Sequence, residues 1–144
     1  MWLCTKYGFF SVKQDAQDRY FIRARVRRDL VNLCDAMQDA FAGDPSDPAL
    51  VRLAAEIHGH ERIDTTSVGE HERYDAAGAV QEWPTADYRF RLIVSGQALG
   101  AVFTLLAGSI DYPNFKSEVA KHPDQRRHLH LYHEVWRTMA GLQD

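Results

Sequence analysis

Apolar and polar residues alternate along the first part of the chain, and the alternation then gives way to a helical period. Residues Trp2–Val12 mix aromatic and β-branched side chains, and Tyr20–Val26 alternate strictly, which is typical of strands. The polar run Lys13–Arg19 between them predicts a hairpin connection. A helix is predicted to begin near Asp29, because an acid in the first turn suits the helix dipole. Its apolar positions follow one face: Leu30, Leu33, Cys34, Met37 and Phe41.

The second part of the chain repeats this pattern. A short strand is predicted over Ala79–Trp83 and a longer one over Tyr88–Val94. Ser95 is a suitable N-cap for a following helix, and Gly108 is a suitable residue to end it.

Two further helices are predicted at the C-terminal end. The turn Asp111–Asn114 precedes a short helix over Phe115–Ala120, and a final helix covers Asp124–Leu142. Apolar residues form one stripe on this final helix: Leu129, Tyr132, Val135, Trp136, Met139 and Ala140.

The order of elements predicts an α+β fold built from two ββα halves. Such halves form a four-stranded, mainly antiparallel sheet with helices on one face, close to a permuted ferredoxin-like arrangement, to which the C-terminal helices are added. The 144 residues correspond to a single domain. Turn-forming clusters indicate an insertion at about residues 42–83.

The charge is divided unevenly. The formal net charge is −3, which excludes a protein that is basic throughout. Residues 42–87, however, carry ten acids against three basic residues, so both flanks are positive. No apolar run is long enough to span a membrane, and the N-terminal residues are unlike a secretion signal, so we expect a cytoplasmic protein with two unpaired cysteines.

Strand alternation places arginines on one predicted sheet face. Arg23 and Arg25 share a face of one strand, and Arg89 and Arg91 share a face of another. The apolar residues Tyr20, Ile22, Ala24, Val26, Tyr88, Phe90, Leu92 and Val94 take the opposite face. The first strand adds either Tyr7 and Phe9 or, in the other register, Lys6 and Phe10. Lys116 is predicted at the edge of this arginine face.

Arginines interleaved with aromatic rings are typical of proteins that bind single-stranded nucleic acid, because guanidinium groups hold phosphates and rings stack on bases. Arginines on a sheet face are also commonly solvated or paired with carboxylates. Both interpretations of the four arginines stay open at this point.

Histidines cluster on the predicted final helix. His128, His130 and His133 fall within six residues, and His130, His133 and Glu134 can share a face. The spacing is not that of a zinc motif, and phosphate-loop and nucleophile-elbow motifs are absent from the sequence, so we expect neither a metal nor a cofactor. A surface role is the simplest interpretation, and His130 or His133 acting as an acid or base is the alternative.

Five short segments, taken together and in order, resemble a family of small, largely uncharacterised bacterial proteins with no established activity. The segments are Thr5–Ser11, Arg23–Arg25, Asp87–Arg91, Asp111–Lys116 and His133–Trp136. The resemblance implies that the middle of the chain is an insertion, and it implies no catalytic residue.

The sequence therefore supports three hypotheses. The first is a protein that binds nucleic acid, a nucleotide or another anion through Arg23, Arg25, Arg89 and Arg91, with Tyr7, Phe9 and Lys116. The second is a small enzyme whose C-terminal histidine acts on an anionic substrate. The third is a homodimer or assembly subunit that associates through the final helix. No membrane is expected as a partner.

Overall fold

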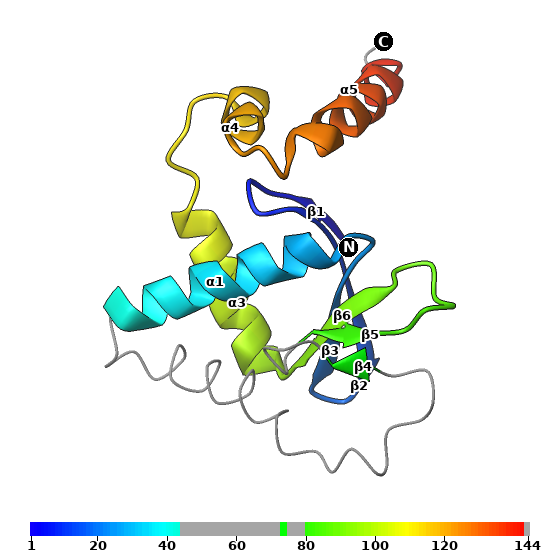
Figure 1. Ribbon diagram of the computed structural model, residues 1–144, viewed down its shortest axis with the longest axis vertical. Helices are drawn as coiled ribbons and strands as arrows, with labels where there is room; N and C mark the ends of the chain where they lie inside the picture. Colours follow the sequence, from blue (N-terminus) through cyan, green and yellow to red (C-terminus); the bar gives the residue numbers. More distant parts are fainter. Residues whose placement is uncertain (44–72, 75–79, 143–144) are drawn as a thin grey trace.

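The computed structural model describes residues 1–43, 73–74 and 80–142. The first group of strands leads to a helix: β1 (Trp2–Cys4), β2 (Phe9–Ala16), β3 (Arg19–Ala24) and α1 (Arg27–Gly43). The second group repeats this order: β4 (Arg73–Tyr74), β5 (Gln81–Glu82), β6 (Phe90–Val94) and α3 (Gly96–Gly108). Two helices follow, α4 (Phe115–Lys121) and α5 (Arg126–Ala140) (Figure 1).

All neighbouring strands of the sheet are antiparallel, in the order β1-β2-β3-β6-β5-β4. The two groups of strands meet where β3 pairs with β6, and Ile22 lies opposite Leu92. The predicted α+β class with an antiparallel sheet is confirmed. The predicted count of four strands is not confirmed, because the order among the described residues contains six. The permuted ferredoxin-like arrangement stays a prediction.

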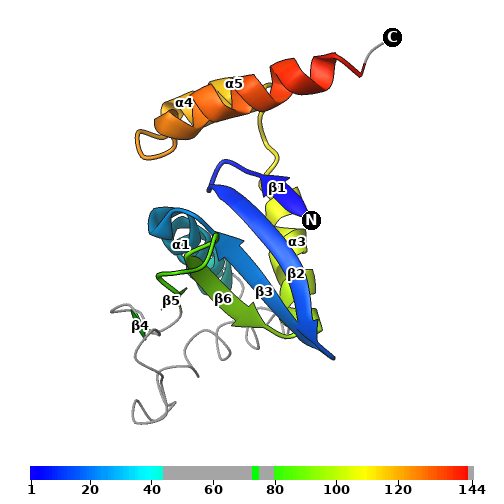
Figure 2. The ribbon, with the colours of Figure 1, turned by 90° about the vertical axis from the view of Figure 1, so that its right-hand side faces the viewer.

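One face of the sheet carries the hydrophobic core. Both α1 and α3 cross this face (Figures 1 and 2). On β3 and β6 the residues with even numbers point into it, as the alternation predicts, and Phe10, Ile22 and Leu92 are almost fully buried. On β1 the residue that packs against the core is Leu3, which pairs with Phe10. From the helices, Leu30, Leu33, Cys34 and Met37 of α1 and Leu99, Val102 and Leu106 of α3 complete the cluster.

Local capping explains where two of the helices begin. The hydroxyl of Ser95 accepts a hydrogen bond from the Ala98 N–H at 3.2 Å, and the side chain of Asn114 accepts one from the Ser117 N–H at 3.0 Å. Both residues are extended N-caps, which satisfy donors that the first turn leaves without partners. The predicted starts of these helices are confirmed.

The first predicted strand is interrupted. The hydroxyl of Thr5 accepts hydrogen bonds from the N–H groups of Tyr7 and Gly8, and the resulting turn separates β1 from β2. Strand β2 then continues to Ala16 through the polar run that predicted a connection. Because exposed strand positions take polar residues, polarity by itself did not mark the turn here. Cys4 is exposed, Cys34 is buried, and both are free thiols.

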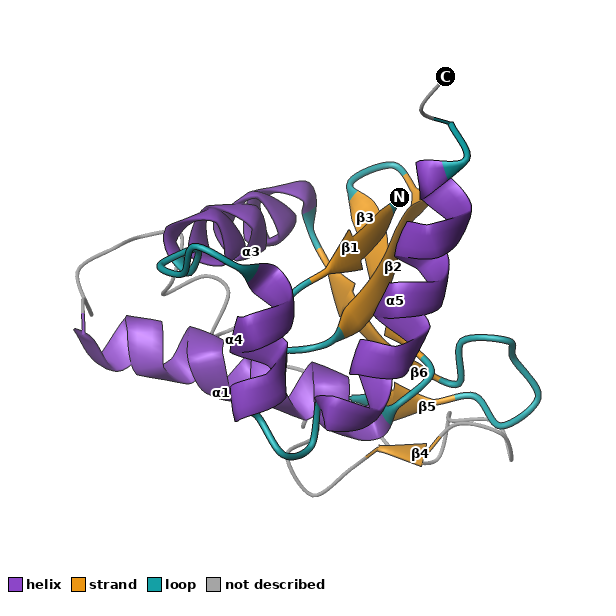
Figure 3. Cartoon of the chain, turned by 90° about the horizontal axis from the view of Figure 1, so that it is seen from above, coloured by secondary structure: helices purple, strands orange, loops and turns teal. Residues whose placement is uncertain are grey.

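Helices α4 and α5 lie together at the β1 end of the sheet (Figures 2 and 3). The predicted apolar stripe on the final helix is only partly buried: Tyr132 is buried, but Val135, Trp136 and Met139 are exposed. The buried positions at the start of this helix are instead Gln125 and His128. Association through α5 stays a prediction. No helix among the described residues is long and apolar enough to cross a membrane.

Most of the predicted insertion lies outside the described residues, which resume with β4 and then at Val80. The acids of residues 44–75 lie outside the described residues too, whereas Glu82 and Asp87 from the same acidic segment are described.

Candidate functional site

The predicted arginine face forms around a cross-strand pair. Arg23 on β3 lies directly opposite Arg91 on β6, so both side chains share the face away from α1 and α3. Arg25 and Arg89 lie just beyond the ends of these strands and are exposed. Strand geometry therefore brings two of the four arginines into register, and the other two border them.

Arg91 is held inside the protein. Its guanidinium lies 3.6 Å from the ring centre of Trp83 and 5.5 Å from that of Phe21, and it donates to the Tyr88 carbonyl at 3.1 Å. Only 4% of Arg91 is exposed. A buried arginine stacked on aromatic rings stabilises this face of the sheet and does not reach an external phosphate.

Tyr88 joins the arginines instead of the core that the alternation predicted. β6 begins only at Phe90, so strand alternation does not extend to Tyr88. Its ring centre lies 4.8 Å from the Arg23 guanidinium and 4.9 Å from that of Arg25. Arg23 also donates to the Ser11 hydroxyl at 2.7 Å.

The two exposed arginines form ion pairs at the surface. Arg25 pairs with Asp87 at 2.8 Å, and both side chains are more than half exposed. Arg89 pairs with Glu82 on β5. Exposed pairs of this kind contribute about 0–1 kcal/mol to stability, so a ligand that carries a negative charge can replace the carboxylate.

The remaining predicted residues lie in different places. Phe9 has the same strand parity as Ser11, so it lies on the arginine face, where its ring contacts Trp2 edge to face. Tyr7 lies in the turn before β2 and packs against the core. Lys116 lies on α4 with its ammonium group 4.1 Å from the ring centre of Trp136.

His130 and His133 are both exposed on α5. His133 borders a shallow depression with Trp136 and Arg137. A cavity that Arg25 borders lies beside the start of α5, and neither histidine lines it. The histidine that does line that cavity is His128, which the sequence pattern placed in the cluster without a separate role.

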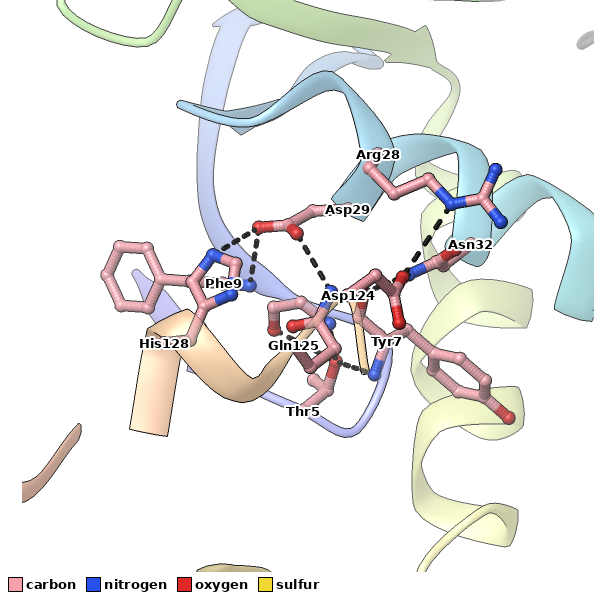
Figure 4. Close-up of polar contacts among 10 residues, drawn as sticks. Thr5, Tyr7, Phe9, Arg28, Asp29, Asn32, Asp124, Gln125 and His128 are labelled. Atoms are coloured by element: carbon pink, nitrogen blue, oxygen red, sulfur yellow. Dashed lines mark hydrogen bonds and ion pairs between the residues drawn. The ribbon is translucent and has the colours of Figure 1, made fainter. Parts of the chain in front are cut away.

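A buried carboxylate joins α1, β2 and α5 (Figure 4). Asp29, of which 1% is exposed, accepts hydrogen bonds from the Phe9 N–H at 3.2 Å and the Gln125 amide at 3.0 Å. Nε2 of His128 lies 3.2 Å from the same carboxylate. Because a carboxylate in this setting only accepts, Nε2 carries the hydrogen.

A second polar contact beside Asp29 fixes the start of α5. The Asn32 amide donates to Asp124 at 2.7 Å and to the Tyr7 carbonyl at 3.2 Å. Arg28 lies 3.6 Å from Asp124. The hydrogen bond from Asn32 is the main cause that lowers the pKa of Asp124 below its ordinary value. Side chains of α1 therefore hold the segment that leads into α5.

A cavity of about 320 Å³ lies between the start of α5 and the β2–α1 side of the body. Its walls are mainly apolar and aromatic, and its lining residues include Trp2, Phe9, Val26, Leu131, Tyr132 and Val135. The polar groups at this cavity come from Arg25, Asp29, Tyr88 and His128. Pockets that bind small molecules typically have apolar walls, a few polar groups and volumes of about 300–1,000 Å³.

Sequence reasoning missed this site because its polar groups come from distant segments. In the sequence, the helix dipole already explains an acid such as Asp29 at the start of a helix, so no further role was assigned to it. Gln125 belongs to no recognisable motif. The available signal was the spacing of Gln125, His128 and Tyr132, which places three polar or aromatic side chains on one face of α5.

No three His, Cys, Asp or Glu side chains gather as a possible metal site among the described residues. No protein-family model, curated protein or solved structure matches the chain.

Proposed function

We propose that this protein binds a small anionic ligand with an apolar body in the cavity beside α5. The observation that carries the proposal is that Arg25, an exposed cation, lines the same cavity as the aromatic walls. A carboxylate or phosphate on the ligand pairs with Arg25, and the apolar body of the ligand is buried against Phe9 and Val135.

Arg25 is suited to this role by its surroundings. The Tyr88 ring supports its guanidinium, which keeps the planar donors in a defined orientation. Its present partner, Asp87, is 68% exposed at the side chain and therefore bound weakly. An arginine also binds carboxylate and phosphate groups through two parallel hydrogen bonds, which a lysine does not do.

A small ligand is favoured over a nucleic-acid strand by the burial of the arginines. Binding along a strand requires several cations that reach successive phosphates. Arg91 is buried, and Arg23 is bonded to Ser11 and stacked on Tyr88. The other two arginines of the predicted face, Arg25 and Arg89, are exposed. One exposed arginine is enough to bind the single acidic group of a small ligand, such as a nucleotide phosphate.

Isothermal titration calorimetry with phenylpropionate, which carries one carboxylate and one aromatic ring, tests the proposal. Wild-type protein is expected to bind, and Arg25→Ala is expected to weaken binding about tenfold or more, because it removes a charge-assisted contact. Arg19→Ala is the matched control, since Arg19 pairs with Asp15 on the β2–β3 hairpin and does not line the cavity.

Equal affinity in Arg25→Ala and wild-type protein would overturn the proposal. So would tight binding of a single-stranded oligonucleotide with a steep salt dependence, measured by fluorescence polarisation, because that result assigns the arginines to nucleic acid.

A further inference from the structure

Two buried polar atoms at the cavity have no partner among the described residues. They are Nδ1 of His128 and the hydroxyl of Tyr132, and the two residues are 5% and 7% exposed. Buried polar groups in folded proteins almost always have a hydrogen-bond partner. The two residues that carry these atoms both line the cavity, which makes a group bound there a candidate partner for both atoms.

The two side chains lie next to each other. His128 and Tyr132 are four residues apart on α5, and their rings stack with centroids 6.0 Å apart. Both line the cavity that Arg25 borders. Phe115 of α4 also contacts the pair, with its ring centre 5.3 Å from that of Tyr132.

The chemistry of the pair follows from its surroundings. Nε2–H of His128 faces Asp29, so a ring that carries this one hydrogen presents Nδ1 as an acceptor. Burial raises the pKa of Tyr132, so its phenol keeps its proton and acts as a donor. The two stacked rings thus carry one acceptor and one donor.

We infer that His128 and Tyr132 form a subsite that recognises a hydroxyl group on the ligand. A hydroxyl donates to Nδ1 of His128 and accepts from the Tyr132 phenol, which satisfies both atoms at once. This inference rests on the function proposed above and narrows the ligand class to a small, hydroxylated apolar acid. Arg25 binds the acid, and the subsite reads the hydroxyl.

The test compares phenylpropionate with its para-hydroxy derivative by calorimetry on the wild-type protein. The hydroxylated probe is expected to bind about tenfold more tightly or better, because the unhydroxylated probe leaves two buried polar atoms unsatisfied. Equal affinities would overturn the inference, since water then satisfies the two atoms, while the proposed function would stand. Failure of both probes to bind would overturn the proposed function as well.

A variant pair gives the second measurement. Tyr132→Phe keeps the ring and removes the donor, so the affinity ratio between the two probes is expected to fall to about threefold or less. Tyr112→Phe is the matched control, because Tyr112 lies before α4 and does not line the cavity, and the ratio is expected to persist. A ratio that is the same in Tyr132→Phe and in wild-type protein would contradict the assignment of Tyr132.

Discussion

Replacing Asp29 with asparagine tests whether one buried carboxylate holds the C-terminal helices on the body. The side chain has the same size, so packing is preserved, but one oxygen becomes an amide group. The three donors that meet at Asp29 come from Phe9, Gln125 and His128. An asparagine oxygen accepts from some of these donors, and its amide group faces at least one of the others.

The loss in the free energy of unfolding expected for Asp29→Asn follows from these contacts. Hydrogen bonds to a charged group contribute about 1.5–3 kcal/mol each, and a buried donor left without an acceptor costs about 1–3 kcal/mol. Asp29 also lies in the first turn of α1, where a negative charge contributes about 0.3–1 kcal/mol. Because Asn retains part of the bonding, we expect Asp29→Asn to lower the free energy of unfolding by about 2–4 kcal/mol.

Urea unfolding followed by circular dichroism measures this change. Asp35→Asn is the matched control, since Asp35 is an exposed acid on the same helix, and a cost within about 0.5 kcal/mol is expected. Hydrogen exchange is expected to show faster opening of α5 in Asp29→Asn, because the lost contacts join α5 to α1. A cost below about 0.5 kcal/mol for Asp29→Asn would refute the reasoning.

Three further predictions concern other contacts. Arg91→Lys is expected to cost about 1–3 kcal/mol and to change the fluorescence of Trp83, because a lysine lacks the planar group stacked on that ring; unchanged emission would contradict this. Gly8→Ala is expected to lower the free energy of urea unfolding by about 1–3 kcal/mol, because a Cβ there overlaps Cβ of Asp29. An unchanged free energy of unfolding would contradict this, since the turn would then accommodate the Cβ. Burial raises the pKa of Tyr132 above its ordinary value near 10, so the unfolded chain ionises first and stability falls as pH rises above about 10. Tyr132→Phe is expected to show a flatter decline over the same pH range.

Much of the fold follows from local physics that the sequence displays directly. Strand alternation assigned Ile22 and Leu92 to the core, and N-cap chemistry placed the helix starts at Ser95 and Asn114. These properties depend on neighbours within a few residues, so a single sequence contains them. The same alternation placed Arg23 and Arg91 on one face, which their cross-strand register confirms.

The fate of each arginine required the tertiary structure. Arg91 is buried because Trp83, from the connection between β5 and β6, covers its guanidinium. Arg25 lies one residue beyond the end of β3 and is exposed, with its guanidinium against the Tyr88 ring. Alternation tells which face a side chain takes, but not what covers that face, since the covering group comes from elsewhere in the chain.

The sequence by itself determined the α+β class, the order of most elements and the face that two of the arginines share. Only the tertiary structure decided which histidine contacts the buried carboxylate. Asp29 and Gln125 are 96 positions apart, and His128 lies three residues beyond Gln125. The hydrophobic pattern by itself predicted that the apolar stripe of α5 packs against the rest of the protein. In the structure, Gln125 and His128 at the start of α5 face the buried carboxylate of Asp29 instead, because a charge inside the protein has to be surrounded by donors.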